Sequence, residues 1–282
     1  MADASSTPPA KWGDLGVRAI SALVLVPLVL AGVWAGGIWF EEFVALLAVL
    51  MAYEWCKLTH RQGSTQFAIH AAAALAGALI PIHSGPGGAL IVIAVLWLAS
   101  AIETRRQGSV ATAWPYLGVP YVGLPAMALV LLRSDPVNGL SAIVWVMVTV
   151  WSADTLAYFA GRIIGGPRLA PVISPKKTWA GLGGAVAGST LVSSIFAYTF
   201  QLNGISALAV LAASLALVEQ VGDLFESALK RFHGVKDSGT LIPGHGGVID
   251  RVDGLIAVAV FAAVFGLFRD NGISAARGLL QW

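Results

Sequence analysis

Residues 206–229 read SALAVLAASLALVEQVGDLFESAL, an apolar run that nevertheless carries acidic side chains. A helix that crosses a bilayer needs about 20 mostly apolar residues, and this run is long enough. Glu219, Asp223, Glu226 and Lys230 are spaced so that they share one face of a helix. A charge at the centre of a span costs roughly 2.5–3.5 kcal/mol, so it needs a polar cavity or a partner. The run therefore predicts a membrane helix whose polar face lines a wet cavity. For Glu226, a purely structural role in an ion pair with Lys230 that stabilises the helix bundle is as favoured as a functional role.

The rest of the chain has the same apolar character. It has 282 residues, of which 57% are hydrophobic and 11% are charged, whereas soluble domains contain about 25% charged residues. We therefore expect an all-α polytopic membrane protein. The nine predicted spans cover residues 16–36, 38–57, 67–83, 87–102, 116–132, 139–161, 179–200, 206–229 and 254–269.

Basic residues sort to one side of these spans. Of the 17 lysines and arginines, only Arg133, Arg269 and Arg277 fall on the other side. The positive-inside rule then places the N-terminus in the cytoplasm and the C-terminus across the membrane. The remaining basic residues are Lys11, Arg18, Lys57, Arg61, Arg105, Arg106, Arg162, Arg168, Lys176, Lys177, Lys230, Arg231, Lys236 and Arg251.

We expect a polar tail (1–15), N-terminal transmembrane helices (16–140) and a C-terminal catalytic region (141–282) with cytoplasmic loops 162–178 and 230–253. Glu41, Glu42 and Glu54 lie near the ends of the second span, where snorkelling to the interface predicts simple anchoring. Asp154 lies within the sixth span and is expected to face a polar cavity. The single cysteine excludes a disulfide framework or a cysteine-based metal cluster.

The cytoplasmic loop 162–178 contains the sequence SPKKT at residues 174–178. We expect Pro175 to stiffen a turn there, and the lysine ammonium groups and flanking hydroxyls to bind phosphate oxygens. The spacing of a Walker A loop is missing. Arg162 and Arg168, nearby, could equally attract anionic lipid.

The second loop and the residues after it read HGVKDSGTLIPGHGGVIDRVDG, residues 233–254. Its glycines allow backbone N–H groups to approach an anion closely. Asp250 and Asp253 would share a helix face if the next helix began near Val248, although Arg251 could balance one of them. Together with Asp223 they offer three oxygen ligands of the kind that Mg²⁺ prefers. A phosphoryl- or nucleotidyl-transfer enzyme with a lipid substrate fits, and the residues alone do not choose between them.

Residues 227–253, SALKRFHGVKDSGTLIPGHGGVIDRVD, resemble the signature of the phosphatidate cytidylyltransferases, or CDP-diacylglycerol synthases. The segments GDLFES (222–227), ADTLAYFAGR (153–162) and ISPKKTW (173–179) are also similar to that family, and the resemblance covers about residues 145–254. One departure is Ala180, where the family usually has Glu. The resemblance implies that CTP and phosphatidate give CDP-diacylglycerol and pyrophosphate with Mg²⁺, and a second cation is plausible.

The resemblance, with carboxylate chemistry, implies metal ligation by Asp223, Asp250 and Asp253. It makes Asp223, Asp250, Lys236 and His245 the expected catalytic residues, with a structural loop role as the alternative for His245. The expected substrate-binding residues are Asp154, Ser174, Lys176, Lys177, Thr178, Ser227, Lys230, Arg231, Asp237, Gly246, Gly247 and Arg251.

The implied partners are CTP, phosphatidate and membrane lipids, without nucleic acid and with a homodimer left open. The expected location is the bacterial inner membrane with the active site facing the cytoplasm. Three alternatives remain: a CTP-dependent lipid kinase, a relative acting on ether lipids, and an ion-coupled transporter that uses Asp154, Glu219 and Asp223 as a relay.

Overall fold

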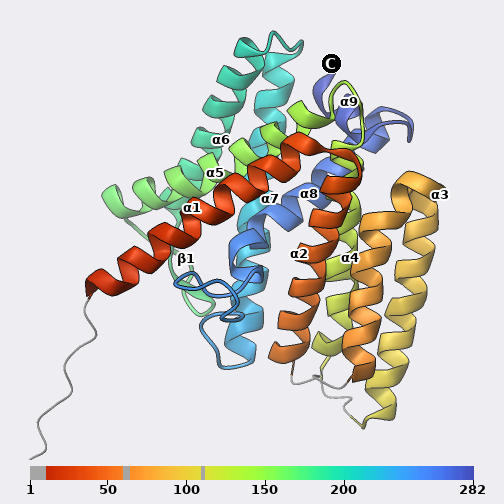
Figure 1. Cartoon of the computed structure of the whole chain (residues 1–282). Coiled ribbons are helices and arrows are strands. Elements are labelled where there is room, and N and C mark those ends of the chain that lie inside the picture. Colours follow the sequence, from red (N-terminus) through yellow and green to blue (C-terminus); the bar gives the residue numbers. More distant parts are fainter. Residues whose placement is uncertain (1–10, 60–63, 109–111) are drawn as a thin grey trace, which may run out of the picture.

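The computed structural model describes residues 11–59, 64–108 and 112–282. Most of the expected polar tail and Arg61 lie outside these residues, as do the side chains of Lys11 and Arg18. The elements in order are α1 (Lys11–Ala35), α2 (Gly37–Leu58), α3 (Ser64–Arg106), α4 (Trp114–Arg133), α5 (Gly139–Ile163), β1 (Arg168–Ala170), β2 (Ser174–Thr178), α6 (Trp179–Thr199), α7 (Ile205–Phe232), α8 (Ile249–Arg269) and α9 (Ala275–Leu280). The described chain is thus nearly all helical, as predicted (Figure 1).

The third and fourth predicted spans form the two arms of α3, which turns back on itself (Figure 1). The reversal occurs at Gly85, whose φ of 74° and ψ of 167° are accessible essentially only to glycine. Pro86 follows directly and supplies no N–H for a continuing helix. The short apolar runs on either side are therefore separate antiparallel segments.

Six of the described helices are long and apolar enough to cross a membrane. They are α3, α4, α5, α6, α7 and α8, which makes the chain an integral membrane protein by length and composition. α2 is not among them, because it carries Glu41, Glu42, Glu54 and Lys57. The exact number of spans and the sidedness of the termini stay predictions.

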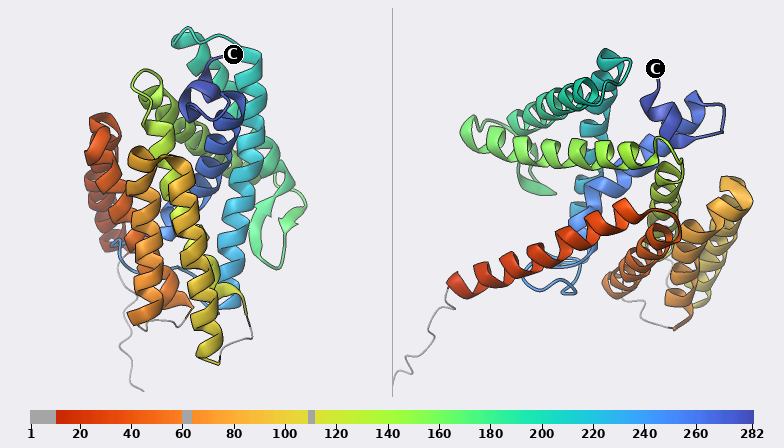
Figure 2. Two further views of the ribbon diagram at one scale, coloured as in Figure 1. Left: turned by 90° about the vertical axis from the view of Figure 1, so that its right-hand side faces the viewer. Right: turned by 45° about the horizontal axis from the view of Figure 1, so that its top comes forward.

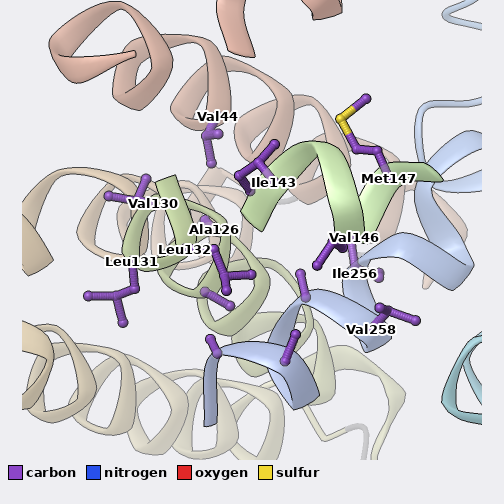
Figure 3. Packing of buried hydrophobic residues seen from close by; sticks show 14 of the residues in the cluster. Val44, Ala126, Val130, Leu131, Leu132, Ile143, Val146, Met147, Ile256 and Val258 are labelled. Atoms are coloured by element: carbon purple, nitrogen blue, oxygen red, sulfur yellow. The ribbon is translucent and has the colours of Figure 1, made fainter. Parts of the chain in front are cut away.

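The main apolar core lies where α2, α4, α5 and α8 meet (Figure 3). Val44 of α2, Leu132 of α4, Ile143 of α5 and Val258 of α8 are all buried in it. In Figure 1 the C-terminal end of α7 lies at the lower end of the bundle, and α9 and the C-terminus lie at the upper end. The core therefore holds α8 against α4 and α5 and brings the start of α8 close to segments far away in sequence.

The segment SPKKT is a strand and not the turn that the sequence suggested. β1 and β2 pair antiparallel, with Arg168 opposite Thr178 and Ala170 opposite Ser174. Figure 2 shows this hairpin projecting beside α7. Thr178 ends the strand and caps α6, because its Oγ1 accepts a hydrogen bond from the Gly181 N–H at 3.0 Å. The strand pairing directs Lys177 towards α7.

Candidate active site

Three carboxylates from α7 and α8 converge. Asp223 and Glu226 lie one turn apart on α7, and an oxygen of each lies within 4.8 Å of the other and of an Asp253 oxygen on α8. Glu226 is fully buried, and its Oε1 has no hydrogen-bond partner among the described residues. Carboxylates so close repel one another unless a cation lies between them. This set of oxygen ligands, one of them buried and unpaired, fits a divalent cation of the Mg²⁺ type.

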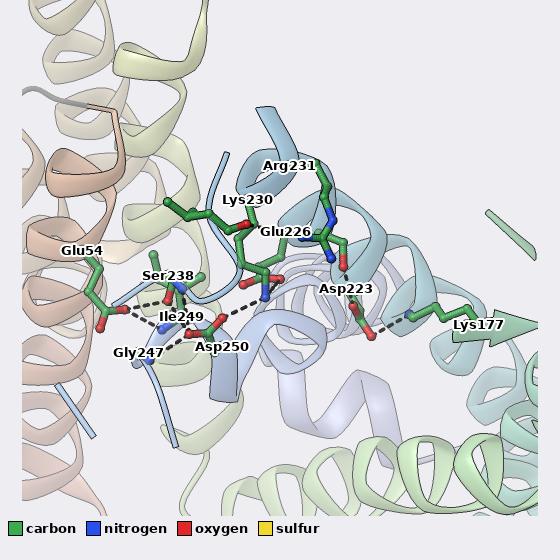
Figure 4. A network of polar contacts seen from close by, with 12 residues as sticks. Glu54, Lys177, Asp223, Glu226, Lys230, Arg231, Ser238, Gly247, Ile249 and Asp250 are labelled. Atoms are coloured by element: carbon green, nitrogen blue, oxygen red, sulfur yellow. Dashed lines mark hydrogen bonds and ion pairs between the residues drawn. The ribbon is translucent and has the colours of Figure 1, made fainter. Parts of the chain in front are cut away.

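A lysine neutralises each flank of this acid cluster, as Figure 4 shows. Lys177 Nζ lies 2.6 Å from Asp223 Oδ2 and donates to Gln220 Oε1 at 3.1 Å. Lys230 Nζ lies 2.6 Å from Glu226 Oε2 and 2.8 Å from an Asp250 oxygen. The ion pair between Glu226 and Lys230 considered from sequence therefore exists, and it belongs to the cluster.

Asp250 has different surroundings from the three acids of the cluster. Its Oδ1 accepts a hydrogen bond from the Lys230 ammonium group at 2.8 Å. Its Oδ2 accepts hydrogen bonds from the Ser238 N–H at 2.8 Å, the Ser238 hydroxyl at 2.9 Å and the Gly247 N–H at 2.8 Å. One oxygen thus pairs with Lys230 of α7, and the other organises the glycine-rich loop. Metal ligation by Asp250 stays a prediction, while Glu226 joins Asp223 and Asp253 in the candidate site.

The prediction that Glu54 anchors its helix at the membrane interface is wrong. Its side chain is fully buried, and it accepts hydrogen bonds from the N–H groups of Val248 and Ile249, both at 2.9 Å. A buried carboxylate must be paired to offset its desolvation, and here the start of α8 supplies the donors. Glu41 is also buried, whereas Glu42 is exposed.

Two cavities adjoin the acid cluster. The first, of about 440 Å³, has charged residues in its wall and is called the polar cavity for that reason; it is lined by Asp223, Lys177 and Asp154, with Arg162, Arg168, Lys176 and Thr178 further round its wall. An apolar one of about 320 Å³ lies between α4, α7 and α8 and includes Asp253, Tyr121 and Phe225. One cavity therefore suits an anionic ligand and the other suits an apolar one.

The glycine-rich loop encloses a third cavity, of about 740 Å³. Lys236, Asp237, His245 and Arg251 line it together with Gly246. His245 Nδ1 is buried without a hydrogen-bond partner among the described residues. These sequence-predicted residues therefore gather around one space beside the start of α8.

The sequence profile of the cytidylyltransferase family matches residues 16–268. The chain belongs to this family. It is 42% identical to the phosphatidate cytidylyltransferase of Brucella suis over 270 residues, which is 93% of this chain and 97% of the relative. It is 40% identical to that of Pseudomonas aeruginosa over 262 residues (88% and 95%) and 34% identical to that of Staphylococcus haemolyticus over 251 residues (86% and 95%).

Most of the residues expected to bind substrate in this cytidylyltransferase surround the cluster or the loop cavity. Ser227 donates to Asp223 at 3.3 Å, and Gly247 binds Asp250. Two line none of the three cavities: Ser174 begins β2, and the exposed Arg231 donates to the Val235 carbonyl. Their roles, like those of the other predicted site residues, stay predictions.

Two residues of the N-terminal half belong to the site and escaped the sequence reasoning. Glu54 is one, and Tyr121 of α4 is the other. The Tyr121 ring packs on Trp55 with centroids 4.6 Å apart and stacks on Phe225 at 5.6 Å. Its hydroxyl is buried and has no partner among the described residues. The only available signal was a polar group within a mostly apolar run, and it did not identify a partner.

Proposed function

We propose that this chain transfers the cytidylyl group of CTP to phosphatidate, forming CDP-diacylglycerol and pyrophosphate. A phosphate oxygen of phosphatidate attacks the α-phosphorus of CTP. A new P–O bond forms, the bond from the α-phosphorus to the bridging oxygen breaks, and the electron pair leaves with pyrophosphate. The attacking oxygen is already anionic, so no serine or cysteine nucleophile is required.

The observation that carries the proposal is the pairing of lysines with converging acids in a member of this family. Two highly anionic reactants repel each other, so the protein must neutralise and align them. Lys177 at the polar cavity and Lys230 beside Glu226 supply positive charge on the two flanks. The apolar cavity at Asp253 offers room for part of an acyl chain. The two cavities therefore reach the acid cluster from different sides, one at Asp223 and the other at Asp253.

Asp223, Glu226 and Asp253 would hold Mg²⁺, which supplies charge neutralisation for phosphate oxygens when bound. Lys177 orients Asp223 and Lys230 orients Glu226 through short ion pairs. His245 of the loop cavity could donate a hydrogen bond to the departing pyrophosphate. The basic loops face the cytoplasm, where CTP is found, and the host membrane is the bacterial inner membrane.

The test is turnover by the purified protein with radiolabelled CTP and phosphatidate, with and without Mg²⁺, while both lipid and nucleotide products are followed. We expect CDP-diacylglycerol and pyrophosphate, and only when Mg²⁺ is present. Lipid phosphate with CDP would indicate a lipid kinase, and absence of any CTP-dependent product would contradict the proposal.

A further inference from the structure

Glu54 of α2 closes the N-terminal end of α8 from 195 positions away in the sequence. Its Oε1 accepts the Val248 N–H and its Oε2 accepts the Ile249 N–H. The first N–H groups of a helix lack intrahelical acceptors, and Val248 at the N-cap provides no side-chain acceptor. A carboxylate at this end is also favoured by the helix dipole. Glu54 therefore takes the place of a local cap.

The loop is shaped to hold this carboxylate. A Cβ at either Gly239 or Gly247 would collide with the Glu54 side chain, so close approach requires glycine at both positions. The same Gly247 donates its N–H to Asp250. The glycines thus let the loop wrap around two neighbouring acids, one from α2 and one from α8.

A continuous set of contacts joins Glu54 to the acid cluster (Figure 4). The Ser238 hydroxyl lies 3.2 Å from Glu54 Oε2 and 2.9 Å from Asp250 Oδ2, so its hydrogen is shared between the two carboxylates. Asp250 binds Lys230 at 2.8 Å, and Lys230 binds Glu226 at 2.6 Å. The rotation and depth of α8 also set where Asp253 lies, since Asp253 is one turn beyond Ile249 and Asp250 on the same helix.

We propose that Glu54 is a positioning residue of the active site: by fixing the start of α8 it places Asp253 in the metal-binding cluster and holds the glycine-rich loop closed. This rests on the proposed function only in that the cluster binds a divalent cation. Glu54 is fully buried and is not one of the three clustered carboxylates. It acts through Val248, Ile249 and Ser238.

Glutamine is the informative replacement. Each carboxylate oxygen of Glu54 accepts a backbone N–H, so either orientation of a glutamine amide would turn its NH₂ group towards a donor. Glu54→Gln thus keeps the size of the side chain and breaks the cap. Glu54→Asp keeps the charge but shortens the reach, and should recover part of the effect. The exposed acid Glu42 on the same helix provides the matched control, Glu42→Gln.

The experiment measures the Mg²⁺ concentration that gives half of the Mg²⁺-induced rise in Tm, together with turnover. We expect Glu54→Gln to raise the half-saturating concentration about 10- to 100-fold, the range found when groups supporting metal ligands are removed. Glu54→Asp should lie between Glu54→Gln and the wild type, and Glu42→Gln should match the wild type. A lower Tm with unchanged half-saturation would assign Glu54 to stability alone and overturn the proposal.

If Glu54→Gln does not fold, Ser238→Ala decides, because it removes only the shared hydroxyl. A raised half-saturating concentration then supports the proposal, and an unchanged one overturns it. The wild-type turnover assay reports on the proposed reaction separately. A wild type that makes no CDP-diacylglycerol refutes that reaction, while the Mg²⁺ titrations still test Glu54.

Discussion

Replacing two aspartates of α8 by asparagine should change stability in opposite directions. Asp253 faces Asp223 and Glu226, whose oxygens lie within 4.8 Å of its own. Two carboxylates at that distance repel by about 3.5 kcal/mol at an effective dielectric constant of about 20. Lys177 and Lys230 offset most of this repulsion. We therefore expect Asp253→Asn to stabilise the metal-free protein by on the order of 1 kcal/mol, or about 2–4 °C in Tm.

Asp250 has the opposite surroundings, because its partners are a lysine and hydrogen-bond donors. Its side chain is 4% exposed and that of Lys230 is 16% exposed. Removing one member of a buried ion pair costs about 3–5 kcal/mol, since the other charge is left uncompensated. Glu226, which also pairs with Lys230, should reduce this loss. Asp250→Asn should therefore lower the Tm by several degrees even without metal.

The assay is thermal unfolding of the detergent-purified protein in chelator and then in increasing Mg²⁺, with turnover measured in parallel. Asp253→Asn should lose the Mg²⁺-induced rise in Tm and at least 99% of turnover, on the order of a hundredfold. Glu42→Gln, an exposed acid remote from the cluster, is the control. A destabilised Asp253→Asn protein, or one that keeps the full Mg²⁺ response, would refute the assignment of the cluster.

Three further predictions concern other contacts. Lys177→Ala should raise the apparent KM for a phosphate-bearing substrate about tenfold or more, because a hydrogen bond to a charged group is worth about 1.5–3 kcal/mol. The control is Lys57→Ala at an exposed site. Unchanged KM values for both substrates, or an equal effect of the control, would contradict this prediction. Tyr121→Phe removes only a buried, unpartnered hydroxyl, so turnover should fall several-fold with unchanged or higher Tm, and full activity would show that the hydroxyl meets no substrate. The third prediction concerns Asp135. Partial burial raises the pKa of Asp135, but hydrogen bonds from the Ser274 hydroxyl and two backbone N–H groups outweigh burial and hold the pKa below its ordinary value of 3.8. The resulting stability is present at neutral pH and is lost as pH falls below 3.8 through the folded pKa; the Tm deficit of Asp135→Asn should shrink over that range, and a pH-independent deficit would count against it.

The predicted division of the chain near residue 140 separates segments that cooperate in the structure. Glu54 and Tyr121 belong to the first part, yet Glu54 binds Val248 and Ile249, and the Tyr121 ring stacks on Phe225 of the second. The motifs that carry the resemblance lie in residues 145–254, because they consist of charged and glycine residues at fixed spacings, whereas the family profile matches residues 16–268. The contribution of the N-terminal half depends on single polar residues with no local pattern.

Local sequence patterns determined the helices and the face of α7 that carries the acids. The apolar runs are fixed by the cost of burying backbone and charge in a bilayer, and the spacing of Asp223, Glu226 and Lys230 follows from the pitch of one helix. Gly85 and Pro86 similarly separate the two arms of α3. For these features neighbouring residues contain all the necessary information.

Only the tertiary structure decided which acids meet. Asp250 and Asp253 are one turn apart and were equivalent candidates, yet Asp253 joins Asp223 and Glu226 while Asp250 organises the loop. Glu54 was predicted to anchor the helix at the membrane interface, but in the structure it caps the start of α8. The physical reason is that the pitch of a helix fixes positions within that helix alone. The rotation and depth of one helix relative to another depend on side-chain packing summed over the whole bundle.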